Sequence, residues 1–199
     1  MKHEGWDGVR RVIQLEDEQL GRLEAYEALL REHALPFGMV SARDAPRLRE
    51  RHVVDSLRAV AAVGSEDRTA YDLGSGAGLP GIVVAIACPG LLVTLVDSRR
   101  SRTAFLELAV DRLGLTNARV LAGRVESLTE QVDLCFARAF AGAADSWRAA
   151  KPLLAPGGRL VYFGGARFQQ ATVPEGVTST LVIPSALARS GPLVIMSQQ

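Results

Sequence analysis

Apolar and polar positions along the chain form two patterns that meet near residue 67. From Thr69 onward, short apolar runs alternate with longer stretches of helical spacing. Such alternation predicts βαβ units and an α/β fold with a mostly parallel sheet. Strands are expected at 69–73, 91–97, 118–122, 132–137 and 159–163, with helices near 79–88, 99–113 and 141–154. Two final β-like runs, 177–183 and 192–197, have no helix between them, which predicts a strand pair with an antiparallel last strand.

The amino-terminal third has a helical pattern throughout. Apolar residues in the segment 9–33 recur at helical spacing and predict one or two amphipathic helices. Asp44, as N-cap, and Pro46 in the first turn predict the start of a second helical stretch that runs to about Val63. We therefore divide the chain into a helical extension, residues 1–66, packed on a core, residues 67–199, that forms one compact unit.

Composition adds few constraints of its own. At 199 residues, the chain has room for one domain with a short extension. The net charge of +1, from 23 basic and 22 acidic residues, gives no global field that would indicate a nucleic-acid partner. All basic residues except Lys2 and Lys151 are arginines. This bias suits phosphate contacts, but a GC-rich genome would also produce it.

Cysteine usage and the amino terminus bear on the compartment. Cys88 and Cys135 lie far apart in apolar runs, unlike the ligands of a zinc site or the bridges of a disulfide scaffold. The amino terminus has no apolar signal-peptide core, and no apolar run reaches the ~18 residues that span a bilayer. These features predict a reduced, cytoplasmic protein with no metal and no membrane partner.

A glycine-rich segment, Tyr71 to Gly81, joins the first predicted strand of the core to its first helix. Glycines at the carboxyl end of a strand allow a sharp turn and the close approach of a cofactor. A dinucleotide fingerprint can be placed on Gly76, Gly78 and Gly81, with Asp97 as the ribose ligand. Its register is poor, because a turn that opens at Gly74 puts Leu79 where the third glycine belongs.

The same segment resembles the first motif of S-adenosylmethionine-dependent methyltransferases, in which an acid precedes Gly-x-Gly-x-Gly. This resemblance implies a Rossmann-like class I methyltransferase with a seven-stranded sheet and S-adenosyl-L-methionine as cofactor. It implies that Asp97 and Ser98, at the end of the second strand, bind the ribose. The loop residues that would hold the methionine end are Asp72, Gly74, Ser75, Gly76, Gly78 and Leu79.

Further segments resemble one methyltransferase family, the glucose-inhibited division protein B group, and cover nearly the whole chain. The most specific are Arg51-His52-x-x-x-Ser56-Leu57 and Gly78-Leu79-Pro80-Gly81. Others lie at 41–44, 95–98, 102–106, 123–126 and 137–140. The family methylates N7 of a guanine in 16S ribosomal RNA. This resemblance implies that the partner is 16S ribosomal RNA or the small ribosomal subunit. Oligomeric state is not encoded in these motifs, and we expect a monomer.

The resemblance also implies roles for individual residues. Arg124, Val125 and Glu126 would lie beside the adenine of the cofactor. Arg138, at the end of the fourth strand, would face the reaction centre, where it would position the substrate or bind the carboxylate of the cofactor. Phe140, in the same loop, would stack on a base or pack in the core. The basic residues Arg43, Arg51, Arg99, Arg100 and Arg102 would form a phosphate-contacting rim or a solvated face.

His52 is expected to be a hydrogen-bonded core residue that joins the helical extension to the sheet. The chain departs from the family pattern at Gly38, Ser101 and Gly164, where many members have asparagine, lysine and lysine. Because these losses concern the substrate side, two alternatives stay open. One is a methyltransferase that acts on a different RNA or a small molecule, and the other is a non-catalytic cofactor-binding relative. Guanine N7 has no proton to lose, so no general base is expected.

Overall fold

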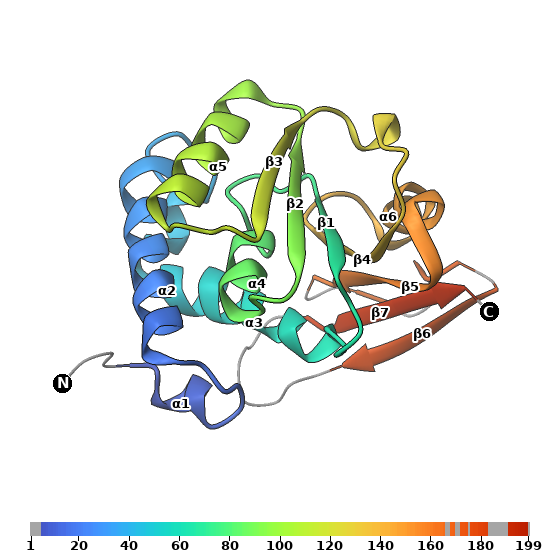
Figure 1. Cartoon of the computed structure of the whole chain (residues 1–199), viewed down its shortest axis with the longest axis horizontal. Helices are drawn as coiled ribbons and strands as arrows, with labels where there is room; N and C mark the ends of the chain where they lie inside the picture. The colour runs from blue at the N-terminus through green and yellow to red at the C-terminus, as the bar shows by residue number, and fades with distance from the viewer. Residues whose placement is uncertain (1–4, 166–167, 170–171, 175, 183–190, 199) are drawn as a thin grey trace.

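One seven-stranded sheet forms the centre of the protein, with the strand order β3-β2-β1-β4-β5-β7-β6 (Figure 1). The computed structural model describes residues 5–165, 168–169, 172–174, 176–182 and 191–198. Strands β1 to β5 are parallel, and β7 runs antiparallel to both β5 and β6. The predicted fold class and the reversed last strand are therefore confirmed. The strands are β1 Thr69–Leu73, β2 Leu92–Asp97, β3 Ala118–Ala122, β4 Val132–Arg138, β5 Leu154–Phe163, β6 Val177–Val182 and β7 Leu193–Gln198.

The sheet order reverses between β1 and β4. The chain passes outward from β1 through β2 to β3 and then returns to pair β4 with the other side of β1. In open parallel sheets, the crevice at the carboxyl ends of such a strand pair is where ligands bind. The topology thus places the ends of β1 and β4 at the centre of any site.

Helices cover both faces of the sheet (Figure 1). One apolar cluster joins α2 (Asp17–Leu29), α4 (Gly81–Ala87) and α5 (Arg100–Arg112) to the sheet and includes Leu23, Ile82 and Leu95. The other joins α6 (Ala143–Ala150) to the sheet and includes Trp147 and Val96. Neighbouring residues Leu95 and Val96 belong to different clusters because successive side chains of a strand point to opposite faces.

The amino-terminal extension is a series of short helical segments. After α1 (Asp7–Arg10) and α2 come a π-helical turn, Leu30–Ala34, a 3-10 turn, Ala42–Arg47, and a second π-helical turn, Arg49–Val54. α3 (Asp55–Leu57) and a 3-10 turn, Arg58–Ala62, complete it. The prediction of Asp44 as the N-cap was wrong, because the N-cap position is Ser41. The Asp44 carboxylate bonds instead to the side chains of Arg51 and His52.

Gln19 fixes α2 against the core. Its Oε1 accepts a hydrogen bond from the backbone N–H of Glu16 at 2.8 Å, within a capping box. Its Nε2 donates to the carbonyl oxygens of Ile86 and Ala87 at 2.9 and 3.1 Å. One side chain thus satisfies backbone groups at the start of α2 and at the end of α4, where helices lack internal partners.

Strand β5 begins five residues earlier than predicted, and the helix before it ends at Ala150 instead of residue 154. Lys151–Leu153 forms a 3-10 turn around Pro152, which the interior of an α-helix would not accept. Gly157, with φ +80°, and Gly158 lie inside the strand, where the register with β4 shifts. Pro156, Gly157 and Gly158 therefore form an irregularity within the strand.

Candidate functional site

A glycine loop at the end of β1 forms the centre of the site. Gly74, Gly76 and Gly78 have φ values of +64°, +61° and +88°, a backbone region that other residues rarely adopt. A Cβ on Gly78 would lie 2.4 Å from Cδ1 of Ile82, so this glycine is required for packing on α4. A Cβ on Gly76 would meet only the carbonyl oxygen of Gly74, at 3.8 Å. The backbone at Gly76 is therefore open to an approaching ligand.

Asp72 joins the two ends of this loop through hydrogen bonds. Its buried Oδ2 accepts hydrogen bonds from Ser75 Oγ at 2.5 Å and from the backbone N–H of Gly81 at 3.0 Å. Burial raises the pKa of Asp72 to about 6, although these bonds and the positive charge of Arg138 oppose the rise. A cation beside this carboxylate would favour its ionised form.

Asp97 reaches the same loop from the end of β2. Its Oδ2 accepts from the backbone N–H of Gly76 at 2.9 Å and from Arg102 Nη1 at 3.3 Å. Its Oδ1 accepts from the backbone N–H of Arg99 at 2.9 Å. Ser98 follows it in the chain and is exposed. The structure thus brings both predicted acids, Asp72 and Asp97, to the glycine loop.

Tyr26 of α2 also contacts the loop, although no motif in the sequence indicates this contact. Its buried hydroxyl donates a hydrogen bond to the carbonyl oxygen of Ala77 at 2.6 Å. Burial, and secondarily the charge of Asp72, hold the pKa of Tyr26 well above its ordinary value, so the hydroxyl stays protonated. Helical spacing identified Tyr26 only as a core position. Its contact with a loop 51 residues away depends on tertiary structure.

Arg138, at the end of β4, is held by the helical extension. Its Nη2 donates to the carbonyl oxygen of Arg51 at 2.8 Å and lies 3.3 Å from Oδ2 of Asp55. Its Nη1 donates to Ser56 Oγ at 3.0 Å, and its guanidinium carbon lies 5.7 Å from the ring centroid of Phe163. Burial lowers its pKa, and Asp55 is the main opposing influence. Arg138 therefore joins the extension to the sheet, and its contact with substrate stays a prediction.

His52 completes this connection, as expected. Its Nδ1 lies 3.2 Å from Arg138 Nη2, and its Nε2 lies 3.0 Å from Asp44 Oδ2. A guanidinium can only donate, so Nδ1 must be unprotonated and Nε2 carries the hydrogen. Burial, together with the charge of Arg138, lowers the pKa of His52. His52 is thus a neutral bridge between Asp44 and Arg138.

The loop after β4 lies on the glycine loop. A Cβ on Gly74 would be 2.7 Å from Cδ2 of Phe140, so the aromatic ring lies directly over this glycine. Phe140 is half-buried and packs against the apolar cluster that contains α6. Ala139 has φ +52°, which is uncommon for a residue with a side chain and is often found at functional sites.

In the segment after β3, exposed and buried side chains alternate. Val125 is buried, whereas Arg124 and Glu126 are exposed. The carbonyl oxygen of Arg124 accepts from the backbone N–H and the hydroxyl of Ser127 at 3.1 and 2.7 Å. In the described part of the chain, Arg124 and Glu126 form no ion pair with each other.

Comparison with known proteins identifies the family. The family model GidB, described as rRNA small subunit methyltransferase G, matches residues 19–177. This chain belongs to the GidB family. It is 42% identical over 175 residues to the ribosomal RNA small subunit methyltransferase G of Ralstonia nicotianae, covering 82% of this chain and 78% of that protein. The protein of the same name from Ruthia magnifica is 35% identical over 182 residues, covering 89% and 88%.

Solved structures of methyltransferases share the fold. The O-methyltransferase TomG from Streptomyces achromogenes, in complex with SAM, superposes with a TM-score of 0.62 at 18% identity, covering 100% of this chain and 99% of that one. A putative O-methyltransferase from Klebsiella pneumoniae superposes with a TM-score of 0.65 at 13% identity and complete coverage of both chains. These likenesses confirm the Rossmann-like methyltransferase fold.

Two of the five arginines predicted to form a basic rim are bound to acids of this GidB family chain. Arg51 Nη1 lies 3.0 Å from Oδ1 of Asp44. Arg102 Nη1 lies 3.3 Å from Oδ2 of Asp97. Both acids also bond to residues of the site, so these arginines help to position Asp44 and Asp97.

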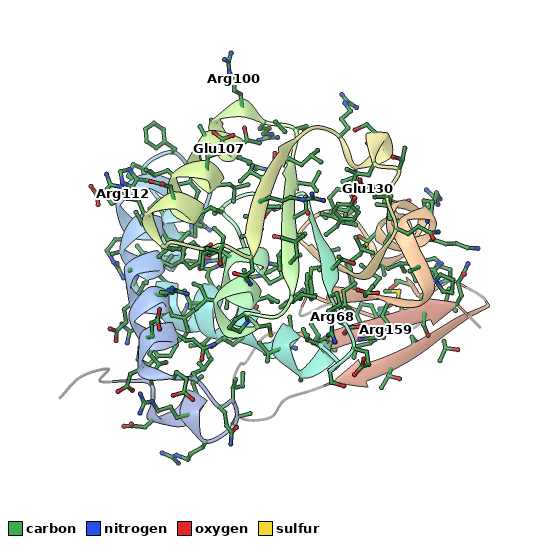
Figure 2. The ribbon with its side chains drawn as sticks, viewed as in Figure 1. Arg68, Arg100, Glu107, Arg112, Glu130 and Arg159 are labelled. Atoms are coloured by element: carbon green, nitrogen blue, oxygen red, sulfur yellow. The ribbon has the colours of Figure 1, made fainter. Side chains whose placement is uncertain are left out.

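The other three arginines of the set, Arg43, Arg99 and Arg100, are exposed. Figure 2 shows Arg100 projecting outward at the amino-terminal end of α5, with Arg112 at the opposite end of the same helix. Arg99 and Arg100 come two and three residues after Asp97, beyond the carboxyl end of β2. Their contact with phosphates stays a prediction.

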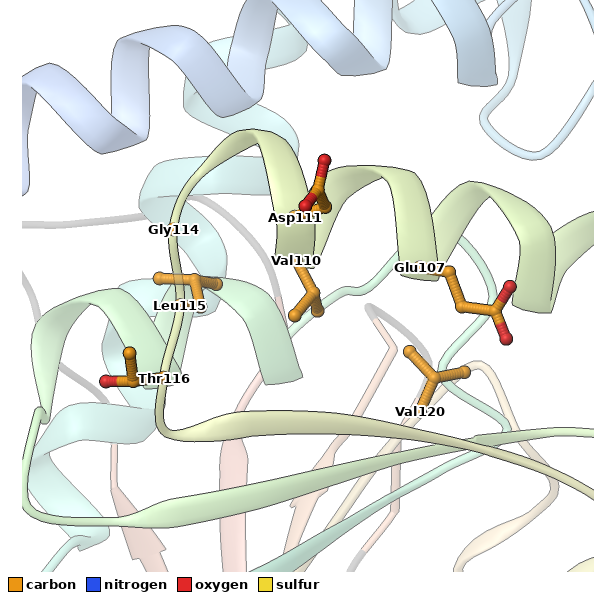
Figure 3. A pocket seen from close by; sticks show the side chains of 7 residues that line it. All are labelled: Glu107, Val110, Asp111, Gly114, Leu115, Thr116 and Val120. Atoms are coloured by element: carbon orange, nitrogen blue, oxygen red, sulfur yellow. The ribbon is translucent and has the colours of Figure 1, made fainter.

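In the described part of the chain, two open cavities lie away from the glycine loop. The first, of about 470 Å³, is formed by α5, β3 and the turn between them (Figure 3). The second, of about 730 Å³, lies between the start of α6, Tyr162 of β5 and the segment after β5. Within the described ranges, no three His, Cys, Asp or Glu side chains cluster as metal ligands. No helix among the described residues is sufficiently long and apolar to cross a membrane.

Proposed function

We propose that this chain transfers the methyl group of S-adenosyl-L-methionine to N7 of a guanine in small-subunit ribosomal RNA. The observation that carries the proposal is the open glycine loop with a buried carboxylate on each side, in a chain of the GidB family. Curated relatives at 35–42% identity are named ribosomal RNA small subunit methyltransferase G.

The residues of the loop suit this cofactor. The open backbone at Gly76 gives room for the ligand, and Asp72 offers a carboxylate to a cationic group. When bound, the cofactor supplies a methyl group on a sulfonium centre. Asp72, Gly74, Ser75, Gly76, Gly78 and Leu79 would hold its methionine end, Asp97 and Ser98 its ribose, and Arg124, Val125 and Glu126 its adenine.

Methyl transfer to guanine N7 requires alignment more than proton transfer. The lone pair of N7 would bond to the methyl carbon, in line with the carbon–sulfur bond that breaks. Positioning of the nucleophile is therefore the main task of the protein. The nearby titratable groups match this requirement. Tyr26 stays protonated, and the neutral His52 is held between Asp44 and Arg138.

Arg138 would position the acceptor. Its Nη atoms contact the helical extension, and its Nε–H has no protein partner within the described residues. This remaining donor could bond to guanine O6, a phosphate or the carboxylate of the cofactor, while N7 stays free. In the same proposal, the extension of residues 1–66 is a cap that shapes the acceptor groove on the core of residues 67–199.

The proposal also covers the contacts with RNA, the cellular compartment and the oligomeric state. Arg43, Arg51, Arg99, Arg100 and Arg102 would contact phosphates, and such contacts weaken as the salt concentration rises. Phe140, over Gly74, would pack against a base or the cofactor. The protein would act in the cytoplasm as a monomer without a metal ion.

The decisive experiment measures transfer of labelled methyl to small subunits, and to their free RNA, from a strain that lacks this modification. We expect label in 7-methylguanosine at one position, identified by nuclease digestion and mass spectrometry. Asp97→Ala should abolish transfer, and Asp111→Ala on the remote part of α5 should not. Label in another nucleotide, or none from protein that binds the cofactor, would favour a different substrate or a non-catalytic relative.

A further inference from the structure

The cavity between α6 and β5 lies beside the cofactor loop. The loop of residues 139–142 begins with Ala139 and Phe140, whose ring lies on Gly74, and ends at Gly142, which lines the cavity. Tyr162 Oη and Ser146 Oγ both donate to the carbonyl oxygen of Ala141 at 3.3 Å and so fix this loop. The cavity is partly open to solvent, and its volume of about 730 Å³ lies within the range of roughly 300–1,000 Å³ typical of ligand pockets.

An aromatic wall lines this cavity. The rings of Tyr162 and Phe168 are both half-buried, with centroids 6.1 Å apart and planes tilted by 47°. A Cβ on Gly164 would lie 3.0 Å from Cγ of Phe168 and 2.9 Å from the carbonyl oxygen of Pro192. The glycine that stands where many relatives have a lysine is thus required for Phe168 to pack here. A flat ligand can stack on one of these two rings.

Two polar side chains complete the lining. Asp145 is mostly exposed, and its Oδ1 accepts from Arg148 Nη1 at 2.7 Å, whereas its Oδ2 has no partner within the described residues. Gln169 is exposed, and its backbone carbonyl oxygen accepts from the hydroxyl and the N–H of Thr172 at 2.6 and 3.0 Å. The cavity therefore offers a carboxylate acceptor and an amide that can donate.

We propose that this cavity is the guanine-binding pocket. The base stacks on Phe168, Asp145 accepts from its N2 amino group, and the Gln169 amide donates to O6, which leaves Arg138 for a phosphate or the carboxylate of the cofactor. Enzymes that act on a base commonly take it out of the stack and bind it by stacking and edge hydrogen bonds. Adenine lacks both O6 and the N2 amino group, so this arrangement discriminates against it. N7 is left without a hydrogen bond, as a methyl acceptor requires.

This inference rests on the proposed function, but it can be tested separately by nucleotide binding. Guanosine monophosphate should bind to the cofactor-loaded protein more tightly than inosine monophosphate, which lacks the N2 amino group, in a titration followed by NMR. Asp145→Asn should remove this difference, and Phe168→Leu should weaken both nucleotides. Equal binding of the two nucleotides by the wild-type protein would overturn the pocket, whether or not methyl transfer to RNA is found.

Methyl transfer to small subunits supplies the second readout. Asp145→Asn should lower kcat/KM by roughly 10- to 100-fold, as expected for loss of a hydrogen bond to a charged group, with unchanged cofactor affinity and unfolding midpoint. Asp111→Asn, an acid of the other cavity, is the matched control and should retain wild-type kcat/KM. Full activity of Asp145→Asn and Phe168→Leu on RNA would overturn the pocket and leave the proposed function intact. No transfer by the wild-type protein would overturn the proposed function.

Discussion

The hydroxyl of Tyr26 on α2 donates a buried hydrogen bond to the carbonyl oxygen of Ala77 in the glycine loop, at 2.6 Å. This bond makes the amino-terminal extension part of the loop's support. A Cβ on Gly78 would lie 3.1 Å from the same hydroxyl, so the loop and α2 are closely packed. Displacement of α2 is therefore expected to alter the loop geometry.

Tyr26→Phe should leave the Ala77 carbonyl unsatisfied in a buried position. We expect the free energy of unfolding to fall by about 1–3 kcal/mol and cofactor affinity to fall several-fold. Chemical denaturation and isothermal titration calorimetry would measure the two effects. Tyr71→Phe is the control, because the Tyr71 hydroxyl makes no hydrogen bond within the described residues. Lower stability with unchanged cofactor affinity would limit Tyr26 to a structural role.

Asp72 should make cofactor binding depend on pH. Its pKa of about 6 means that it is largely protonated at pH 5 and ionised at pH 7.5. Because only the ionised form attracts a cationic ligand, affinity should rise from pH 5 to pH 7.5, by up to roughly tenfold. Calorimetry at several pH values would measure this rise, and Asp72→Asn should remove it. An unchanged profile in the variant would assign the dependence to another group.

The same carboxyl group should affect stability with the opposite dependence on pH. The folded protein holds this proton up to about pH 6, whereas the unfolded chain releases it near pH 3.8. The contribution of Asp72 to stability is therefore greatest below pH 3.8 and falls as the pH rises through 6. At pH 7, Asp72→Asn should raise the free energy of unfolding by about 1–3 kcal/mol. A less stable variant would show that the carboxylate is better solvated than its burial indicates.

His52 should titrate below its ordinary pKa of 6.5, and its two partners should shift that value in opposite directions. Arg138→Met removes a positive charge and should raise the pKa of His52, whereas Asp44→Asn removes a hydrogen-bonded carboxylate and should lower it. Imidazole NMR shifts would give both values and the Nε2–H tautomer. Because the unfolded chain binds the proton first, this group lowers stability as the pH falls through 6.5. If Arg138→Met lowers turnover without moving the His52 resonances, the two residues are not coupled.

The packing around Gly81 leaves no room for a side chain. A Cβ there would lie 2.3 Å from Cδ2 of Leu95 and 2.6 Å from Oδ2 of Asp72. Gly81→Ala should therefore lower the free energy of unfolding by about 1–3 kcal/mol and weaken cofactor binding. Gly90→Ala, where nothing lies within 4 Å, should change stability by less than about 0.5 kcal/mol. Equal effects of the two substitutions in thermal denaturation would contradict this packing argument.

Arg99 and Arg100 should contribute to RNA binding through charge. Replacing both with alanine should weaken binding to small subunits and lower the slope of log K against log salt by roughly one per lost contact. Arg112→Ala, at the other end of α5, should leave both quantities unchanged. A loss of cofactor affinity in the double variant would instead indicate an effect on Asp97.

The sequence was sufficient to predict the sheet and the loop. Strand and helix periods identified the alternating elements, and the acids Asp72 and Asp97 follow from their places at the ends of β1 and β2. Local patterns failed at the extension, where contacts of Asp44 with Arg51 and His52 outweigh its capping preference. They failed again at β5, because glycines can end a helix or lie within an irregular strand.

Roles that depend on distant contacts could not be predicted from local pattern. Arg138 ends an apolar strand, which indicates that it needs a partner, but Asp55 and Ser56 are supplied from more than 80 residues away. Only a family resemblance associated these segments. Tyr26 carried no signal beyond helical spacing, since its hydroxyl partner is a backbone carbonyl.

Arg58 has a consequence for synthesis of the chain. Its buried guanidinium bonds to Oδ1 of Asp55 at 2.8 Å and to the carbonyl oxygen of Gly191 at 2.7 Å, 133 residues later. Removing one partner from a buried charge is strongly destabilising. Arg138 of β4 also contacts this extension, through Arg51 and Asp55. The nascent amino-terminal helices therefore cannot reach their final packing before Arg138 and Gly191 are translated. Native structure at the beginning of the chain is completed only when its last strand is made, so chains shortened at the carboxyl end should be substrates for chaperones and proteases.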